Sequence, residues 1–462
     1  MNADSAPGAG GAGVGPAGGD SWIDYLESLA VFGMRPGLER VEALLERLGR
    51  PQDAYRVVHV VGTNGKSSTT RALAAILSAH GVKTGTYTSP ELISMTERIE
   101  IDCAPVSEET FASGIAAALD GIDRLRAEGL IAEDAVVTQF ELLTGAALWL
   151  FAEHEVEVAC LEVGMGGRWD ATSVVSPAVA VITGVALDHM EHLGTTRETI
   201  AEDKAHIIKP GSIAILGPGT EGVEQAFLAR AEACDARVRA VRAAGAPSPV
   251  PDELTVRYEV TARPDRPGGS LALDVTGAYG AYRGLTLRAP SYQAANVATA
   301  VAAAEATLGR ALDAEATRGA LARLRFPGRF ELVREAPPVV IDGAHNPDAA
   351  HVLADAIREA WPDPAHRPAV LLGILADKDV GGILEALAHV ASQFACTQSA
   401  SLRALDADAL ARMVHELTGE RPLVFGSVGE ALDALIPDSS DGIVATGSIT
   451  TAGEARRHLL ES

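Results

Sequence analysis

The sequence predicts a two-domain α/β protein, and three observations lead to that fold class. A buried apolar run at 56–61 ends in a glycine-rich turn and passes into a helical pattern at 66–80. Continuous apolar runs then alternate with helical periodicity, as in a parallel sheet covered on both faces. A second alternation of this kind starts at 339, beyond the chain break at 326–328. We therefore expect an N-terminal mononucleotide-binding domain with a P-loop and a C-terminal Rossmann-like α/β domain.

The expected elements of the first domain follow from the period of their apolar residues. Apolar positions three and four apart predict helices, and short continuous apolar runs predict buried strands. Alternating segments at 271–287 predict antiparallel strands appended to the parallel sheet. The strands are expected at 56–61, 84–88, 156–163 and 178–183, and the helices at 22–31, 66–80, 138–153, 293–308 and 314–324, with a further helix after Pro36.

Composition at the N-terminus and the chain break at 326–328 divide the chain into four parts. Residues 1–20 are rich in Gly, Ala and Pro and have almost nothing to bury, so we expect a disordered tail, with order beginning at the helix cap Ser21. A nucleotide-binding domain is expected at 21–326, a hinge at 327–338 and a second α/β domain at 339–462. The strands expected in the second domain are 339–341, 369–375, 423–425 and 443–445.

Charge and composition limit the classes of partner. The 462-residue chain has a formal charge of −24, which argues against a nucleic-acid partner, because such a surface is basic. No apolar run approaches the roughly 18 residues of a membrane span, and no secretory signal is visible. The four cysteines lie far apart without CxxC spacing, so we expect a protein of the reducing cytoplasm. An anionic substrate must then be held by a few local cations.

The glycine-rich turn after the first strand has the composition of a phosphate loop. Its glycines let backbone N–H groups converge on phosphate oxygens, and the helix that follows adds partial positive charge. Lys66 can neutralise the outer phosphates of ATP, and the hydroxyl of Ser67 or Ser68 can reach Mg²⁺. The usual pattern has a glycine where this chain has Val60, and the competing interpretation is a glycine turn without a ligand. The loop consists of Gly62, Thr63, Asn64, Gly65, Lys66, Ser67 and Ser68.

Lys204 is notable without reference to any family. In a helix expected at 196–208, it lies on the same face as Ile200, Ile207 and Ile208. Burial of an ammonium group is costly, so its pKa should fall and leave a neutral, nucleophilic amine. The alternative is that the side chain extends past the apolar stripe to solvent.

Ten segments in one order resemble the Mur ligase superfamily, and within it the folylpolyglutamate synthase branch. Each is weak evidence alone, whereas ten in this order across nearly the whole chain are specific. They are GLERV at 37–41, GTNGKSS at 62–68, YTSPEL at 87–92, TQFELLTGAA at 138–147, LEVGMGGRWDAT at 161–172, LDHMEHLG at 187–194, EDKAHIIKPG at 202–211, YQAANVATA at 292–300, FPGRFE at 326–331 and DGAHNPDAA at 342–350.

The resemblance implies an ATP-dependent ligase that joins L-glutamate to folates and, in bifunctional members, to dihydropteroate. ATP would phosphorylate a substrate carboxylate, and the amino group of glutamate would attack the resulting acyl phosphate, with release of ADP and phosphate. Mg²⁺ and a monovalent cation are the cofactors that it implies. We expect a monomer whose partners are these small molecules, without nucleic acid or membrane.

The matching positions imply the residues of the ATP and metal sites. A hydroxyl and a carboxylate suit Mg²⁺, whereas an imidazole suggests a second, weaker site. Family members carry a carbamate at the position of Lys204. Taken alone, Ser89 fits a turn before a proline, and Asp342 fits the N-cap of a helix that starts at Pro347. The implied metal ligands are Ser89, Glu162 and His189, the further ATP-binding residues are Asn296, Arg329 and Asp342, and the catalytic residues are Lys66, Lys204, Asp342 and His345.

Two further stretches match the segments that line the pterin site in this family. Phe140 or Trp169 could stack on a flat pterin, and Glu141 or Asp170 could accept hydrogen bonds from its N–H groups. The alternative is that both aromatic residues belong to the core. The chain departs from the family pattern at Glu91, where histidine is common, at Ser173, where asparagine is frequent, and at Ser67, where glycine or threonine is usual. The stretches are Thr138, Gln139, Phe140 and Glu141, and Trp169, Asp170 and Ala171.

Other functions fit the sequence less well. Peptidoglycan Mur synthetases and cyanophycin synthetase place a large domain ahead of the phosphate loop, whereas 61 residues precede Gly62 here. A non-enzymatic P-loop switch would leave Lys204, Arg329 and the second domain without a role. A rate of nucleotide turnover that does not change when glutamate and folate are added would favour the switch.

Overall fold

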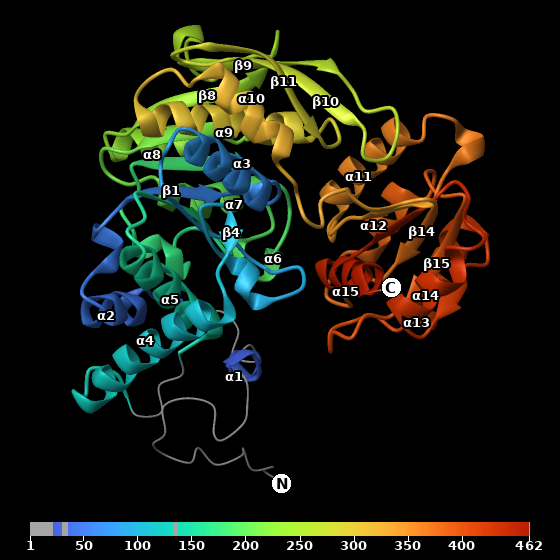
Figure 1. Cartoon of the computed structure of the whole chain (residues 1–462), viewed down its shortest axis with the longest axis horizontal. Helices are drawn as coiled ribbons and strands as arrows, with labels where there is room; N and C mark the ends of the chain where they lie inside the picture. The colour runs from blue at the N-terminus through green and yellow to red at the C-terminus, as the bar shows by residue number, and fades with distance from the viewer. Residues whose placement is uncertain (1–21, 30–35, 133–136, 462) are drawn as a thin grey trace.

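Both expected α/β domains are present in the computed structural model, which describes residues 22–29, 36–132 and 137–461 (Figure 1). The expected tail at 1–20 and the helix cap Ser21 lie outside these residues. Among the described helices, none is both long enough and apolar enough to cross a membrane.

The N-terminal domain is built on a sheet of eleven strands, counted over the described residues. Their order is β11-β10-β9-β8-β7-β6-β1-β5-β2-β3-β4. The strands from β9 to β2 in this order run parallel, and antiparallel strands extend both edges. The strands are β1 (Arg56–Val61), β2 (Thr84–Tyr87), β3 (Ile99–Ile101), β4 (Ala104–Pro105), β5 (Val158–Glu162), β6 (Val179–Gly184), β7 (Ile213–Gly219), β8 (Arg237–Ala243), β9 (Thr255–Ala262), β10 (Ser270–Thr276) and β11 (Ala281–Arg288).

Helices cover both faces of this sheet, which explains why its central strands are continuous apolar runs. One face packs against α3 (Lys66–Ala79), α9 (Gln293–Leu308) and α10 (Ala314–Arg323). The apolar residues of the other face join two cores. These cores contain α1 (Trp22–Leu29), α2 (Glu39–Arg47), α4 (Glu108–Ala127) and α5 (Gln139–Glu153) on one side, and α7 (Arg197–Lys204) and α8 (Glu224–Ala233) on the other; the short α6 (Met190–Leu193) precedes α7.

Most predicted elements of this domain are confirmed. β1 and α9 have the predicted bounds, and α3, α5, α10, β2, β5 and β6 differ from them by at most two residues. The predicted antiparallel pair is β10 with β11. β9 was not predicted, because its outer half is exposed and lacks a regular apolar pattern. The helix expected at 196–208 is shorter, since α7 ends at Lys204 and a 3-10 turn follows.

The C-terminal domain has a second sheet, of six strands within the described residues. Their order is β12-β13-β17-β14-β15-β16, and all neighbours are parallel except β12 and β13. β13, β14, β16 and β17 were predicted, whereas β12 and β15 were not. The elements are β12 (Glu331–Glu335), β13 (Pro338–Ile341), α11 (Pro347–Ala360), β14 (Ala369–Leu372), α12 (Val380–Leu387), β15 (Gln393–Thr397), α13 (Ala407–Thr418), β16 (Leu423–Phe425), α14 (Val428–Leu435), β17 (Ile443–Thr446) and α15 (Ile449–Glu461).

The stretch 327–338, predicted as a hinge, contains a strand of the second sheet. β12 occupies 331–335 and pairs with β13, so irregular chain in this stretch is confined to the residues before Glu331 and the turn at 336–337. The division of the chain at this point stays a prediction.

The two sheets present their carboxyl ends to each other, so that the loops after their strands meet. Asn64 follows β1 and contacts Asn346, which follows β13. Asp188 follows β6 and contacts Lys378, which follows β14. The carboxyl edge of an α/β sheet is where such folds bind ligands, and here two such edges face one cleft.

Candidate active site

The phosphate loop is braced by the segments on either side of it. A side-chain carbon added at Gly62 would lie 1.9 Å from Oγ1 of Thr183, and one added at Gly65 would lie 2.5 Å from Oδ1 of Asn296. Gly65 also has a φ of +80°, which glycine adopts at little cost. The Thr183 hydroxyl donates to the Asn64 carbonyl over 2.7 Å. The loop is therefore held as a tight cradle at the start of α3, where phosphate groups bind favourably.

Two of the three expected metal ligands lie together at the ends of neighbouring strands. Glu162 ends β5 with 1% of its surface exposed. Its Oε1 accepts a hydrogen bond from the Ser67 hydroxyl over 3.0 Å, and its Oε2 accepts one from the Ser89 N–H over 3.3 Å. Burial raises the pKa of Glu162, an effect that the positive charge of Lys66 opposes. A carboxylate with two neighbouring hydroxyl residues suits a hard divalent cation.

The structure also separates the two serines of the phosphate loop. Ser67 faces Glu162, whereas the Ser68 hydroxyl is buried and accepts a hydrogen bond from Nε2 of Gln293 over 3.2 Å. Gln293 in turn accepts one from Asn296 over 2.8 Å. Ser67 is therefore the better placed hydroxyl for a metal ion, and Ser68 belongs to the contact between α3 and α9.

His189, the third expected ligand, has a different neighbour. Its Nε2 lies 3.9 Å from Oδ2 of Asp188, and its side chain is 42% exposed. Among the described residues, no three or more His, Cys, Asp or Glu side chains converge as a metal site would require. Mg²⁺ commonly takes one or two carboxylates and completes its shell with substrate phosphates and water, so the Glu162 cluster agrees with that mode of binding.

Two lysines lie at the phosphate loop, Lys204 buried and Lys66 partly buried. Lys204 is 4% exposed, as its apolar stripe predicts, and its Nζ donates to the Gly62 carbonyl over 3.3 Å. Burial lowers its pKa to about 7, and the positive charge of Lys66 contributes to this shift. Lys66 donates to the Thr63 carbonyl over 3.1 Å, and burial also lowers its pKa. The Lys204 amine is thus substantially neutral near pH 7, which a carbamylation reaction needs.

Asp188 joins the two domains, and sequence reasoning did not single it out. Its Oδ1 lies 3.3 Å from Nζ of Lys378, and its Oδ2 accepts from Nδ2 of Asn346 over 3.3 Å. Nε2 of His345 lies 3.8 Å from the same Oδ2. Burial alone would raise the pKa of Asp188, but His345, His189 and Lys378 together hold it well below its ordinary value. Asp188 is therefore ionised within a ring of donors.

Asp342 lies at the end of β13, and its carboxylate holds the backbone of the domain connection. Oδ1 accepts from the Ala344 N–H and Oδ2 from the Phe330 N–H, each over 2.8 Å. The Tyr292 hydroxyl lies 3.4 Å from Oδ2. Burial raises the pKa of Asp342, and the charge of Arg329 opposes that shift. The residue shapes the loop that carries Arg329 and His345, and its direct contact with ATP stays a prediction.

The alternative that Asp342 caps the helix from Pro347 is wrong. Asn346 is the N-cap of α11, because its Oδ1 accepts from the Ala349 N–H over 2.8 Å. In the first turn of this helix, Oδ2 of Asp348 accepts from Nδ2 of Asn64 over 2.8 Å. The phosphate loop and α11 are thus in direct contact across the domain boundary.

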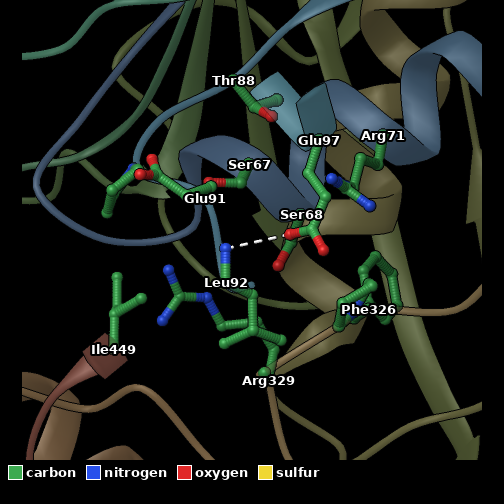
Figure 2. Close-up of a pocket in the computed structure, with 13 residues that line it drawn as sticks. Ser67, Ser68, Arg71, Thr88, Glu91, Leu92, Glu97, Phe326, Arg329 and Ile449 are labelled. Atoms are coloured by element: carbon green, nitrogen blue, oxygen red, sulfur yellow. Dashed lines mark hydrogen bonds between the residues drawn. The ribbon is translucent and has the colours of Figure 1, made fainter. Parts of the chain in front are cut away.

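Arg329 projects from the domain connection into a pocket beside the phosphate loop. Figure 2 shows its guanidinium between Leu92 and Ile449, in a pocket that Ser67 also lines. Its charge acts on Glu162, where it lowers the carboxyl pKa against the effect of burial. Arg329 and Lys66 therefore supply positive charge to one region from the two domains.

Three residues of the first predicted pterin stretch already form hydrogen bonds within the fold. Thr138 caps α5 in a capping box in which Oε2 of Glu141 accepts from the Thr138 N–H over 2.8 Å. Oε1 of Glu141 pairs with Arg40 over 2.7 Å. The amide of Gln139 donates to the Leu26 carbonyl over 2.9 Å. Both oxygens of Glu141 are thus engaged, so its predicted contact with a pterin would require these bonds to open.

The second stretch contains one buried, hydrogen-bonded residue and one exposed residue. Asp170 is 3% exposed and accepts hydrogen bonds from the N–H groups of Thr172 and Met165, each over 3.0 Å, which fix the loop that contains Ala171. Trp169, in contrast, is 39% exposed, with the guanidinium of Arg168 4.9 Å from its ring centroid. The interpretation of Trp169 as a core aromatic is therefore wrong.

Phe140 and two of the residues that depart from the family pattern, Glu91 and Ser173, each contact another residue of the fold. The ring of Phe140 lies 5.8 Å from that of Tyr87, centroid to centroid, so it packs at the edge of the core. Oε2 of Glu91 accepts from Nε of Arg98 over 2.5 Å, and the Ser173 hydroxyl donates to the Gly167 carbonyl over 2.5 Å. Trp169 is the accessible candidate for stacking.

A compositional signal could have identified Lys378. The chain has 38 lysine and arginine residues, of which five are lysine: Lys66, Lys83, Lys204, Lys209 and Lys378. Three of them, Lys66, Lys204 and Lys378, lie around this cleft. A chain that uses arginine almost everywhere retains lysine where a compact ammonium or a neutral amine is needed.

The arrangement can polarise a phosphoryl group and shelter a reactive intermediate. The phosphate loop and Lys66 face Arg329 and α11 across the cleft. Fixed positive charge at the place where negative charge develops is the largest single contribution to many group transfers. Closure of the two domains would exclude water from an activated acyl group.

Comparison with known proteins agrees with this geometry. Residues 60–225 match the Mur ligase middle domain, and residues 328–449 match the Mur ligase glutamate ligase domain. The chain is 37% identical to the dihydrofolate synthase/folylpolyglutamate synthase of Mycobacterium tuberculosis, over 91% of this chain and 89% of that protein. It is also similar to the solved structure of Escherichia coli FolC in complex with DHPP and ADP, with 32% identity, a TM-score of 0.81, and 95% and 96% of the two chains covered. A bifunctional folylpolyglutamate synthase/dihydrofolate synthase with Mn, AMPPNP and L-glutamate bound has 30% identity, a TM-score of 0.79, and coverage of 95% and 97%.

Proposed function

Since this chain belongs to the dihydrofolate synthase/folylpolyglutamate synthase family of Mur ligases, we propose that it adds L-glutamate both to folates and to dihydropteroate. The chain is an ATP-dependent amino-acid ligase. One observation carries the proposal: the phosphate loop of one domain and α11 of the glutamate ligase domain meet through Asn64 and Asp348 over 2.8 Å. A site assembled in this way brings a phosphorylated acid and an amino acid together.

The proposed reaction passes through an acyl phosphate. Lys66 and Arg329 stabilise the charge that develops on the transferred phosphoryl group, and the start of α3 adds its partial positive charge. The bond from phosphorus to the bridging oxygen of ADP breaks as the substrate carboxylate attacks. Glutamate nitrogen then attacks the acyl carbon, and phosphate leaves. His345 and Asp342 order the loop beside this cleft.

A divalent metal ion belongs to this chemistry, and we propose Mg²⁺. Glu162 with Ser67 and Ser89 fits such an ion, because a carboxylate and hydroxyl oxygens are its preferred protein ligands. The ion supplies neutralising charge to the nucleotide phosphates. His189 is proposed for a second, weaker site. A monovalent cation remains proposed without assigned residues.

We further propose a carbamate on Lys204 and a monomeric, cytoplasmic enzyme. Burial and the lowered pKa of Lys204 support the carbamate, since a neutral amine is the reactive form. The four cysteines are free, which agrees with a reducing compartment.

The proposed function is tested by ADP release from purified enzyme with ATP, Mg²⁺ and L-glutamate. Tetrahydrofolate and dihydropteroate are supplied separately, and mass spectrometry identifies the products. Each acceptor should gain one glutamyl residue per ADP released. ADP release that is unaffected by both acceptors would contradict the proposal.

A further inference from the structure

A histidine lies in the middle of the apolar run that forms the central strand of the first sheet. His59 belongs to β1, which pairs with β5 on one side and β6 on the other, and none of its surface is exposed. Gly62, the first residue of the phosphate loop, follows three residues later. A buried polar ring costs free energy unless its nitrogen atoms form hydrogen bonds. The contacts of His59 therefore indicate why a polar residue is present here.

His59 begins a chain of hydrogen bonds that ends at Asp170. Its Nε2 lies 2.8 Å from Oγ1 of Thr172, and the Thr172 hydroxyl donates to Oδ1 of Asp170 over 2.5 Å. A hydroxyl has one hydrogen atom, and because Thr172 gives it to the carboxylate, the same oxygen must accept from His59. Nε2 therefore carries the ring hydrogen. Nδ1 has no hydrogen-bond partner among the described residues.

This chain has a fixed direction at neutral pH. Burial, with a contribution from the positive charge of Lys209, lowers the pKa of His59 to about 3, so the ring is neutral and donates from Nε2 alone. Burial raises the pKa of Asp170, and the hydrogen bonds from Thr172 and from the Met165 N–H oppose that shift. Hydrogen bonds in a buried chain polarise and strengthen one another. The chain therefore favours the ionised form of Asp170.

Asp170 in turn closes the loop that carries Trp169. Its Oδ1 accepts from the Thr172 N–H and its Oδ2 from the Met165 N–H, each over 3.0 Å. Both carboxylate oxygens thus hold the backbone of residues 165–172. Trp169, the neighbour of Asp170 in the chain, is exposed. The placement of this exposed ring therefore depends on the hydrogen bonds of the buried carboxylate beside it.

The same carboxylate lies where the two stretches predicted for the pterin meet. A side-chain carbon added at Gly164 would lie 2.7 Å from Cζ of Phe140 and 3.1 Å from Oδ2 of Asp170. The absence of a side chain at Gly164 lets the ring and the carboxylate approach each other. One end of the hydrogen-bond chain is thus at this meeting point, and the other is on the strand that leads into the phosphate loop.

We propose that His59 and Thr172 are positioning residues for the acceptor substrate: through Asp170 they hold residues 165–172 in the conformation in which Trp169 contacts the flat ring of the acceptor. The proposal rests on the function proposed above and adds two residues that act without touching a substrate. Because His59 is on β1, a single strand then fixes the positions of the nucleotide loop and of the acceptor loop.

The test measures steady-state constants for variants that each remove one bond of the chain. His59→Leu removes the ring donor, and Thr172→Val removes the hydroxyl with little change in shape. KM for tetrahydrofolate and for dihydropteroate should rise roughly three- to tenfold in each variant, as expected for the loss of one hydrogen bond. KM for ATP and for L-glutamate should change little.

Conservative and double variants separate the hydrogen bonds from the volume of the side chains. The amide nitrogen of His59→Gln can donate at a reach similar to that of Nε2, and Thr172→Ser retains the hydroxyl, so both should have acceptor KM values near the wild type. Because His59 acts through Thr172, the double variant His59→Leu/Thr172→Val should raise the acceptor KM no further than Thr172→Val alone. If the two single effects multiply, the chain is not their cause and the proposal is overturned.

The matched control is Thr317→Val. Thr317 is fully buried, as Thr172 is, but its hydroxyl donates to the Asp313 carbonyl at the start of α10. Both Thr→Val changes should lower the free energy of unfolding, and only Thr172→Val should raise KM for the acceptors. If Thr172→Val is destabilised but retains wild-type KM for both acceptors, the chain only stabilises the fold and the proposal is overturned.

The remaining outcomes are also decisive. If His59→Leu does not fold, the comparison of Thr172→Val with Thr172→Ser decides the proposal by the same criterion. An equal rise of KM for ATP and for the acceptors would assign the chain to the phosphate loop and overturn its role for the acceptor. If the wild type releases no ADP with either acceptor, the proposed function fails, which differs from normal turnover with unaltered acceptor KM in the variants.

Discussion

The Ser67 hydroxyl donates a hydrogen bond to Oε1 of Glu162 over 3.0 Å, which connects the phosphate loop to the end of β5. Ser68, its neighbour, faces away and contacts Gln293 on α9 instead. Adjacent serines of one loop thus have different partners. We therefore expect Ser67 to serve the proposed metal site and Ser68 to support the nucleotide loop.

The first prediction is that Ser67→Ala and Ser68→Ala have different kinetic effects. Ser67→Ala should raise the Mg²⁺ concentration needed for half-maximal activity, roughly tenfold for one lost hydrogen bond to a charged group. Ser68→Ala should leave this concentration nearly unchanged, because its hydroxyl contacts the α9 side. Titration of activity with Mg²⁺ at saturating ATP measures both. Equal shifts in the two variants would contradict the assignment of Ser67.

The second prediction concerns the carbamate on Lys204. Because the pKa of Lys204 is lowered to about 7, the amine is mainly neutral at pH 8 and mainly protonated at pH 6. In CO₂-depleted buffer, added bicarbonate should restore activity at pH 8 but barely at pH 6. Lys204→Ala should be nearly inactive and partly recovered by short carboxylates.

Arginine variants provide the control for this prediction. A guanidinium cannot carry the carbamate, so Lys204→Arg should be inactive, whereas Lys209→Arg, five residues further on, should retain activity. Wild-type turnover by Lys204→Arg would refute the carbamate.

The third prediction is a gain of stability on removing the Lys204 charge. A lysine whose folded-state pKa is lowered binds its proton more weakly in the folded protein, so protonation favours unfolding. The penalty is complete below pH 7 and disappears as pH approaches the ordinary lysine value of 10.5. In CO₂-depleted buffer, Lys204→Met should therefore unfold with a free energy higher by on the order of a few kcal/mol at pH 6. Denaturant unfolding at pH 6 and pH 10 checks this, and a difference that grows with pH would contradict the sign.

The fourth prediction is that the domains close when both substrates bind. The contact between Asn64 and Asp348 joins the phosphate loop to the second domain, so we expect closure and nucleotide binding to be linked at this point. Small-angle scattering should show compaction with an ATP analogue and folate together, and Asp348→Ala should weaken it. If the scattering of fully active enzyme is the same with and without these ligands, the domains do not close.

The fifth prediction assigns pterin stacking to Trp169. Trp169→Ala should raise KM for both tetrahydrofolate and dihydropteroate roughly tenfold, because one exposed aromatic face is lost. Tyr279→Ala is the control, since Arg239 lies 4.9 Å from its ring centroid in a pair of the same kind. Enzyme that extends tetrahydrofolate but never makes dihydrofolate would refute the dual substrate range.

Local features of the site could be predicted from the sequence because they depend on neighbours in the chain. β1, the glycine turn and α3 follow from apolar period and glycine placement. Burial of Lys204 was predicted correctly from the neighbouring isoleucines, although α7 ends at Lys204 and only Ile200 shares its helical face. The capping box of Thr138 and Glu141 also has a sequence signature, Thr-x-x-Glu, which would have identified the structural role of Glu141.

Contacts between the domains could not be predicted in this way. Asp188 and Lys378 are 190 residues apart, and their pairing depends on how two sheets face each other. β12 escaped prediction because it is an edge strand that is only partly buried, and β9, an interior strand, because its outer half is exposed and lacks a continuous apolar run. The rarity of lysine in the chain was the one signal that pointed to Lys378.

The central claim is that the acceptor carboxylate is activated by phosphoryl transfer from ATP. The measurement that tests it most directly uses acceptor folate with oxygen-18 in its reacting carboxylate, together with ATP, Mg²⁺ and L-glutamate. One labelled oxygen should appear in the released phosphate, with ADP as the other product. Unlabelled phosphate, or AMP with pyrophosphate, would contradict the account.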